Sequence, residues 1–186
     1  MKMKMITATL AGLFMSGSAI ASTEVGAILG FGIMSAKSSA EGTGGSANGL
    51  LFGLRGGKRL DSGLAIDGQF LRHSGSSTVN VMGTEISTTT SQMLIGAGVR
   101  YYIGDGGVTP FVSSHLNYHL GASVGGSGAS ISVPESSGLG LDVGGGAQFG
   151  LGDTLYAEAL GYYSLQLTGT NKLNNLGIGA GFGAKF

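Results

Sequence analysis

The segment 174–186 alternates strictly between two kinds of side chain. Its even positions, from Leu176 to Phe186, are apolar, and its odd positions, from Asn175 to Lys185, are glycine, asparagine or lysine. Successive side chains of a β-strand point to opposite faces of a sheet. The segment therefore predicts a strand with one apolar face and one nearly bare face. A transmembrane β-barrel uses this alternation with lipid on the apolar face and a polar lumen on the other.

The same two-residue period recurs along the rest of the chain. Helical periodicity is missing, and no apolar run after residue 22 is long enough for a membrane-spanning helix. The predicted strands are 24–34, 47–55, 63–72, 92–103, 109–122, 138–151, 154–166 and 174–186. Most have about ten residues or slightly more, which is close to what a tilted strand needs to cross the hydrocarbon. The pattern thus predicts eight strands in one domain, an even number that closes without a free edge.

The connections between these strands alternate in length. Short turns rich in glycine and aspartate are predicted at 56–62, 104–107 and 152–153. Polar loops rich in serine, threonine and glycine are predicted at 35–46, 73–91, 123–137 and 167–174. Within the second loop we expect residues 78–86 to form a hairpin that continues above the membrane. The alternation indicates short periplasmic turns, longer extracellular loops and both termini on the periplasmic side.

The first residues have the pattern of a secretory signal peptide. Lys2 and Lys4 precede an uncharged run from Met5 to Met15, and the segment 18–21 has the small-x-small form of a cleavage site. The run is shorter than the roughly 20 residues that a spanning helix needs. We therefore predict a signal peptide over 1–21 and an exported barrel domain over 22–186.

Composition and charge exclude several classes of function and stabilisation. Loss of two lysines with the signal peptide would leave eight basic residues against ten acidic ones, a net charge of about −2, which provides no basic field for nucleic acid. Cysteine is absent, so disulfides cannot stabilise the exported chain. In a closed barrel the complete inter-strand hydrogen-bond ladder can do so, because lipid offers no competing water. The 38 glycines fall mostly on one parity of the alternation, which indicates structure rather than disorder.

With these strands, turns and the terminal Phe186, the chain resembles the small eight-stranded outer-membrane barrels, namely the OmpA- and OmpX-like and opacity-type "porin family" proteins. The resemblance implies an all-β, eight-stranded antiparallel up-and-down transmembrane β-barrel in the outer membrane of a Gram-negative bacterium. It also implies that Phe182 and Phe186 form a C-terminal signal for the barrel-assembly machinery. Outer-membrane lipids and lipopolysaccharide are the partners that this location implies. The chain departs from the family in having no tryptophan, which leaves the aromatic girdles to tyrosine and phenylalanine.

Polar side chains on the inward parity of the predicted strands should fill the lumen. We predict a structural polar network formed by Arg55, Asp67, Arg100, His115, Asn117, His119, Asp142, Glu158 and Lys185. Gln69, Gln92, Gln148 and Gln166 share this parity. Charged groups in a narrow interior of low dielectric are tolerable when they are paired. Since eight strands leave an interior just wide enough for side chains, we expect a plugged lumen.

Inward glycines gather on the last strand, between Gly177 and Gly183, and on the first, at Gly26, Gly30 and Gly32. The larger inward residues of the fourth and fifth strands should therefore reach across the lumen toward a bare wall. Packing of small against large side chains is one interpretation. A narrow water-filled channel, or a cavity for a small ligand, is the alternative.

The chain offers no convincing catalytic, cofactor-binding or metal-binding residues. His115 and His119 lie four residues apart, which on a strand is about 13 Å, too far to share one metal ion. Ser114 faces away from both of them, and His73 lies at a loop edge without an evident oriented partner. We therefore predict no enzyme, and a structural or surface-interaction role in which the loops carry any recognition of a host or surface ligand. A channel is the second hypothesis and a lipid A-modifying enzyme is the third.

Overall fold

The computed structural model describes residues 20–37, 44–81, 84–126, 129–133, 137–169 and 172–186. The predicted signal peptide lies almost wholly outside this part of the chain, so its cleavage after residue 21 stays a prediction. No helix long and apolar enough to cross a membrane occurs among the described residues.

The described residues form nine antiparallel β-strands. These are β1 (Ile20–Lys37), β2 (Gly44–Leu60), β3 (Leu64–Val81), β4 (Thr84–Tyr102), β5 (Val108–Gly126), β6 (Ala129–Val133), β7 (Gly138–Gly150), β8 (Leu155–Gln166) and β9 (Lys172–Lys185). They follow the order β4-β3-β2-β1-β9-β8-β7-β5-β6, and β4 also pairs with β5. That last pairing closes the sheet, so the predicted eight-stranded all-β barrel is confirmed.

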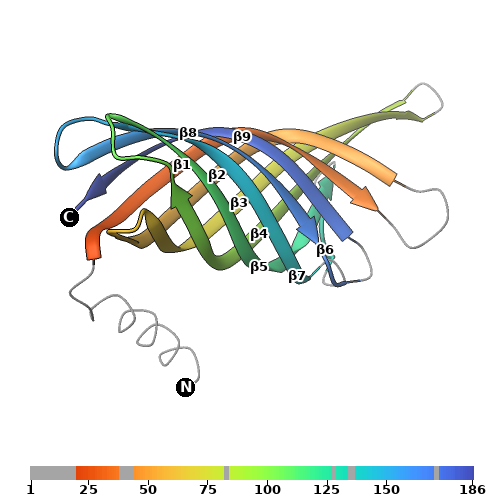
Figure 1. Cartoon of the computed structure of the whole chain (residues 1–186). Coiled ribbons are helices and arrows are strands. Elements are labelled where there is room, and N and C mark those ends of the chain that lie inside the picture. Colours follow the sequence, from red (N-terminus) through yellow and green to blue (C-terminus); the bar gives the residue numbers. More distant parts are fainter. Residues whose placement is uncertain (1–19, 38–43, 82–83, 127–128, 134–136, 170–171) are drawn as a thin grey trace, which may run out of the picture.

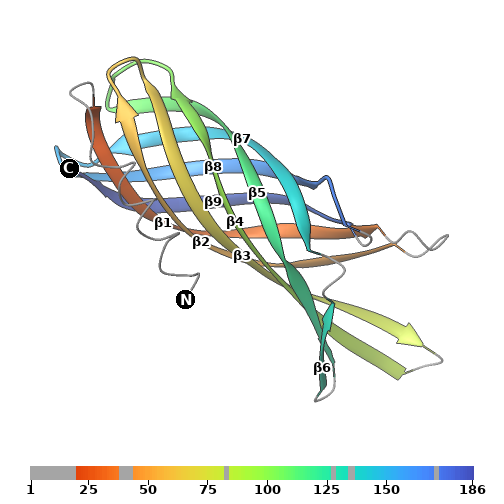
Figure 2. The ribbon, with the colours of Figure 1, turned by 90° about the horizontal axis from the view of Figure 1, so that it is seen from below.

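The first and last strands close the barrel, and the short turns and the long projecting strands lie at opposite ends of it, as predicted. The closing pair is β1 with β9, and the ladder runs to the last residue, because Thr23 and Phe186 exchange backbone hydrogen bonds of 3.0 and 2.9 Å. The C-terminus lies at the end of the barrel that carries the short turns (Figure 1). The long β3–β4 hairpin and β6 project from the opposite end (Figures 1 and 2).

The strands on the projecting side are longer than predicted. Most of segment 73–91 was expected to be a loop, yet β3 and β4 stay paired up to Val81 and Thr84. The expected hairpin over 78–86 is therefore present, as the tip of a longer ladder. Hydroxyl pairs cross this ladder, with Thr78 Oγ1 at 3.0 Å from Ser87 Oγ. Serine, threonine and glycine occupy both faces at residues 74–78 and 87–91, so the sequence there lacks the apolar alternation from which the other strands were predicted.

Two further differences lie in the connections. The segment 123–137 was predicted as a loop, but it contains the end of β5 and the short strand β6, which pairs back onto β5. The turn predicted at 56–62 is shorter, because β2 continues to Leu60. Gly63, with φ of +80°, then closes the turn by donating its N–H to the Leu60 carbonyl at 3.0 Å. The turns at 104–107 and 152–153 lie where they were predicted, and Gly104 and Gly152 also adopt positive φ.

The wall of the barrel has an apolar outside and a polar inside. Leu50, Leu29 and Ile178 are 72%, 66% and 68% exposed, whereas Arg100 is 2% exposed. A water-soluble protein shows the opposite distribution, since charged side chains are almost never fully buried unless they are paired. The exposed apolar band is the surface that faces lipid.

Glycine and large inward side chains alternate between neighbouring strands. Inward residues of β8 lie opposite the glycines of β9, where Tyr162 pairs with Gly177 and Glu158 with Gly181. A Cβ atom at Gly177 would lie 2.6 Å from the Tyr162 ring. The bare wall is thus covered first by the adjacent strand β8. Only the large residues of the fourth and fifth strands were considered in the sequence analysis, and the cover from β8 adds to them.

Candidate functional site

Four charged side chains form a closed ring across the middle of the lumen. Arg55 of β2 lies with Nη1 2.9 Å from Glu158 Oε1 and with Nε 3.6 Å from Asp67 Oδ2. Arg100 of β4 lies with Nη2 2.9 Å from Asp67 Oδ2 and with Nη1 3.1 Å from Glu158 Oε2. Each arginine therefore contacts both carboxylates, and the four formal charges sum to zero. Buried charges need such pairing to offset their desolvation.

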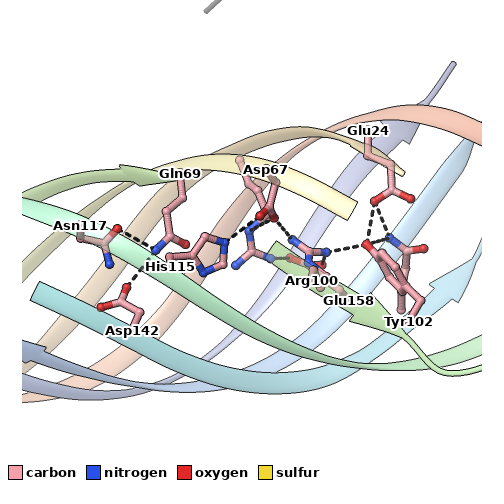
Figure 3. A network of polar contacts seen from close by, with 11 residues as sticks. Glu24, Asp67, Gln69, Arg100, Tyr102, His115, Asn117, Asp142 and Glu158 are labelled. Carbon is pink, nitrogen blue, oxygen red and sulfur yellow. Dashed lines mark hydrogen bonds and ion pairs between the residues drawn. The ribbon is translucent and has the colours of Figure 1, made fainter. Parts of the chain in front are cut away.

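The ring spans the barrel because of the strands that supply it. Asp67 lies on β3 and Glu158 on β8, and these strands are four places apart in the closed order of eight. They are therefore on opposite walls. Figure 3 shows Arg100 lying between these two carboxylates.

Toward the short-turn end the ring continues into an aromatic and acidic cluster. Arg100 Nη1 donates to the Tyr102 hydroxyl at 2.7 Å, and this hydroxyl donates to Glu24 Oε2 at 2.8 Å. Gln148 Nε2 donates to both groups at 3.3 Å. The Arg59 guanidinium group lies over the Tyr102 ring, with Cζ 4.1 Å from the ring centroid. The short-turn end is therefore closed by connected side chains.

Toward the extracellular end the ring continues through His115. Its Nε2 donates to Asp67 Oδ1 at 2.8 Å. Beside His115, Gln69 Nε2 donates to Asp142 Oδ2 at 2.9 Å and to Asn117 Oδ1 at 3.2 Å (Figure 3). His115 also covers Gly98 and Asn117 covers Gly96, so β5 and β4 repeat the pairing of large residues with glycines.

A separate polar cluster lies nearer the extracellular mouth. Gln92 Nε2 donates to His119 Nδ1 at 2.8 Å, and Gln92 Oε1 accepts from Asn175 Nδ2 at 2.9 Å. Beside this cluster Tyr162 Oη lies 2.8 Å from His73 Nε2. All five side chains are buried.

Little space remains between these groups. An enclosed cavity of about 10 Å³ lies beside the ring, lined on its polar side by Arg55, Gln69, His115 and Asp142. That volume holds about one water molecule.

Eight of the nine residues predicted for the lumen network lie inside the barrel, but they form more than one cluster. Arg55, Asp67, Arg100, His115, Asn117, His119, Asp142 and Glu158 are buried inside the barrel. Lys185 is different. It is only partly buried, at the short-turn mouth, with Nζ 5.6 Å from the centroid of the Tyr156 ring. Lys185 is the last residue of β9, so its side chain points inward at the rim of the barrel, where no wall encloses it.

Sequence reasoning missed two members of the interior. Glu24 stands at an even position of its strand, like the inward-facing Gly26, Gly30 and Gly32. This alternation alone would have placed Glu24 in the lumen, where it is buried. His73 was thought to lie at a loop edge without a partner. It is 2% exposed and bonded to Tyr162, because β3 continues past it. Arg72, next to His73, is exposed on the outer face.

No group of three or more histidine, cysteine, aspartate or glutamate side chains placed to hold a metal ion occurs among the described residues. His115 and His119 belong to different clusters, bonded to Asp67 and Gln92 respectively. Phe182 and Phe186, the predicted assembly signal, are 55% and 79% exposed on the outer face. Their recognition by the assembly machinery stays a prediction.

The second feature with functional potential is the sheet that projects from the barrel. Beyond residue 74, β3 pairs with β4, the first part of β4 pairs with the end of β5, and β5 pairs with β6. The projection is therefore a four-stranded sheet, which we call the extracellular sheet (Figure 2). Among the described residues β6 pairs with β5 alone, which leaves its other edge open.

The chain shares its architecture with solved outer-membrane barrels. Neisserial surface protein A aligns with a TM-score of 0.68 and 22% identity, over 88% of this chain and 97% of that one. Ail, the attachment invasion locus protein of Yersinia pestis, solved with the heparin analogue sucrose octasulfate, aligns with a TM-score of 0.54 and 18% identity, over 88% and 99%. The N-terminal β-barrel domain of Pseudomonas aeruginosa OprF aligns with a TM-score of 0.54 and 15% identity, over 91% and 100%. These likenesses concern the fold.

Among curated protein sequences none matches the chain. The sequence pattern of the outer membrane protein beta-barrel domain family, however, matches residues 6–186. That match covers every strand of the barrel and the terminal phenylalanine. The chain therefore belongs to the outer membrane protein beta-barrel domain family and resides in the bacterial outer membrane.

Proposed function

We propose that this protein is a non-conducting, non-enzymatic barrel that anchors the extracellular sheet for recognition at the cell surface. The observation that carries the proposal is the contrast between the two halves of the molecule. The lumen is filled by a ring of paired charges and by hydrogen-bonded polar clusters on both sides of it, while β3, β4 and β5 continue beyond the membrane-facing band and form a sheet with β6. A barrel that served only to pass solutes across the membrane would need an open lumen and would not need an extended extracellular sheet.

The chemistry of the extracellular sheet indicates what kind of surface it can recognise. Residues 74–91 are mostly serine, threonine and glycine with a few apolar residues and Asn80, and Glu85 is the single charged residue. Such a segment provides hydroxyl groups and an open strand edge rather than a charged patch. Ail was solved with a sulfated ligand, but this part of the present chain has no basic side chain to bind one. Pairing of an extended partner segment with residues 77–81 of β3, which among the described strands pair with β4 alone, is the mode that fits.

The proposal is tested by shortening the β3–β4 hairpin. Ser76 and Thr89 lie opposite each other, so residues 77–88 can be replaced by Asn-Gly, the favoured two-residue hairpin turn. We expect the variant to keep its heat-modifiable migration on gels, because no lumen residue is removed. Adherence of bacteria that display it to host cells should fall at least fivefold.

The matched control removes residues 39–42 from the β1–β2 connection, outside the extracellular sheet. It should adhere like the wild type. Equal adherence of the wild type and the shortened hairpin, with both barrels folded, would refute a role of this sheet in recognition.

The same filled lumen predicts that the protein does not conduct ions. A channel lined by the inward glycines was the alternative hypothesis, but Tyr162 and Glu158 lie against those glycines and the enclosed cavity holds about one water. We expect no stepwise current when the folded wild-type protein is inserted into planar lipid bilayers. Reproducible unitary steps from several independent preparations would contradict the non-conducting part of the proposal.

Support for a non-enzymatic role comes from the histidines. His115 donates to Asp67, and Ser114, the nearest serine in sequence, lies on the opposite face of β5. His73 is bonded to a tyrosine hydroxyl inside the barrel. None of these arrangements aligns a nucleophile, a base and an orienting group.

A further inference from the structure

We propose that the short-turn end of the barrel binds a small zwitterion, a molecule with one carboxylate and one ammonium group, such as an amino acid or a dipeptide. This end carries the C-terminus (Figure 1) and faces the periplasm in barrels of this kind. The site lies across the membrane from the extracellular sheet. The inference therefore goes beyond surface recognition and does not depend on it.

The site is an open pocket of about 390 Å³ at the mouth of the barrel. Strands β1, β2, β5 and β9 and two of the short turns contribute to its lining. The polar side chains of this lining are Ser22, Arg59, Asp61, Asp105, Thr109 and Lys185. Pockets for small molecules have volumes of roughly 300–1,000 Å³, so this one has room for an amino acid or a dipeptide.

Arg59 of β2 and Lys185 of β9 form the cationic part of the pocket. Arg59 is held in place, because its guanidinium group stacks over the Tyr102 ring with Cζ 4.1 Å from the centroid, and only 12% of its side chain is exposed. Lys185 has no salt-bridge partner among the described residues. A fixed guanidinium group beside a free ammonium group suits a carboxylate ligand.

Glu24 is the nearest internal candidate to neutralise Lys185, since the two residues are register partners on β1 and β9. Its carboxylate is turned toward the interior instead (Figure 3), where Oε2 accepts hydrogen bonds from Tyr102 and Gln148. Lys185 Nζ lies over the Tyr156 ring, 5.6 Å from its centroid. The charge of Lys185 is therefore available to a ligand in the pocket.

Asp61 and Asp105, on two of the short turns, form the anionic part of the pocket, and both are exposed. Asp105 Oδ1 lies 3.4 Å from Arg59 Nη2, but 96% of the Asp105 side chain is exposed. An ion pair so open to water contributes little stability, so a ligand can replace it at low cost.

The pocket thus presents two cationic and two anionic side chains to one ligand. A simple anion would be repelled by the aspartates, and a simple cation would be repelled by Arg59 and Lys185. A zwitterion can place its carboxylate at the cationic side chains and its ammonium group at the aspartates. This charge complementarity selects the class of ligand.

The test measures binding of alanyl-alanine to the folded protein in detergent micelles by ligand-observed saturation-transfer NMR. We expect saturation transfer to alanyl-alanine. N-acetyl-alanyl-alanine lacks the ammonium group, and alanyl-alanine amide lacks the carboxylate. Each should bind about fivefold more weakly, the change that loss of one exposed charge contact typically causes.

Variants of the pocket test the same contacts from the side of the protein. Lys185→Met and Asp105→Asn should each weaken binding of alanyl-alanine about fivefold. Lys58→Met is the matched control for the lysine, because Lys58 precedes Arg59 on β2 and points to the other face. Asp153→Asn is the control for the aspartate, since Asp153 is exposed on a short turn outside the pocket. Both controls should bind like the wild type, and heat-modifiable migration verifies folding of every variant.

The stereochemistry of the probe identifies the source of the ligand. Peptides of the bacterial cell wall contain D-alanine, whereas peptides derived from proteins contain L-alanine. Tighter binding of the D,D form would assign the site to the cell wall, and tighter binding of the L,L form would assign it to free peptides.

Three results would overturn the proposal. The first is an absence of saturation transfer from the folded wild type to either form of alanyl-alanine. The second is equal binding of alanyl-alanine and its two blocked derivatives. The third is an equal effect of Lys185→Met and Lys58→Met, which would mean that overall charge rather than this pocket governs binding.

Discussion

Replacing Arg100 by methionine is expected to lower the free energy of unfolding by about 3–5 kcal/mol, the usual cost of removing one partner from a buried ion pair. Arg100 contacts both Asp67 and Glu158 and donates to the Tyr102 hydroxyl. Methionine fills a similar volume without a charge. Two carboxylates would then share Arg55 as their remaining guanidinium partner in the ring.

The measurement is equilibrium unfolding by guanidinium chloride of the barrel folded in lipid vesicles. Arg72→Met is the matched control, because Arg72 is exposed on the outer face, and it should change stability by less than about 0.5 kcal/mol. Adding Glu158→Gln to the Arg100→Met variant should recover part of the loss, since one unpaired charge is removed with its partner. Equal stabilities of the two arginine variants would show that water or neighbouring groups compensate the ring.

Parity along the strands was sufficient to predict which residues face the lumen, but not which of them touch. Asp67 and Glu158 were both placed inside, yet their shared contacts with Arg100 depend on how far each strand is staggered around the barrel. Stagger follows from the shear of the closed sheet, which the alternation of a single strand does not encode. The sequence therefore predicted the contents of the lumen and left its connections undetermined.

Segments without an apolar face were the other limit of prediction. Residues 74–91 extend β3 and β4 into water, where neither face needs to be apolar, and their composition resembled a loop. His73 was misplaced for the same reason, because the strand was taken to end at Arg72. The glycine row of β9 was recognised, but its cover comes from β8, and a glycine pattern does not reveal which neighbour fills the space beside it.

Gly30→Ala is expected to destabilise the barrel strongly at β1 and β9, the pair of strands where the sheet closes. Gly30 of β1 lies opposite Gly179 of β9. A Cβ atom at Gly30 would lie 2.8 Å from the Gly179 Cα and 3.1 Å from the Ile178 carbonyl carbon. These are backbone atoms, so relief requires the two strands to separate rather than a side chain to rotate. Overpacking of this kind typically costs about 1–3 kcal/mol, and here it acts on the last pairing that forms the closed ladder.

Gly56→Ala on β2 is the matched control, because the added methyl group would meet Val25 Cγ1 at 3.6 Å, an ordinary van der Waals contact. It should fold like the wild type, or slightly better, since alanine restricts the unfolded chain. The fraction of heat-modifiable protein after refolding into vesicles, with the unfolding midpoint in denaturant, compares the two variants. If Gly30→Ala refolds as completely and unfolds at the same midpoint as Gly56→Ala, the pairing of β1 with β9 accommodates a methyl group at residue 30. Close approach of β1 and β9 would then not be the reason for the glycines on both sides of the closure.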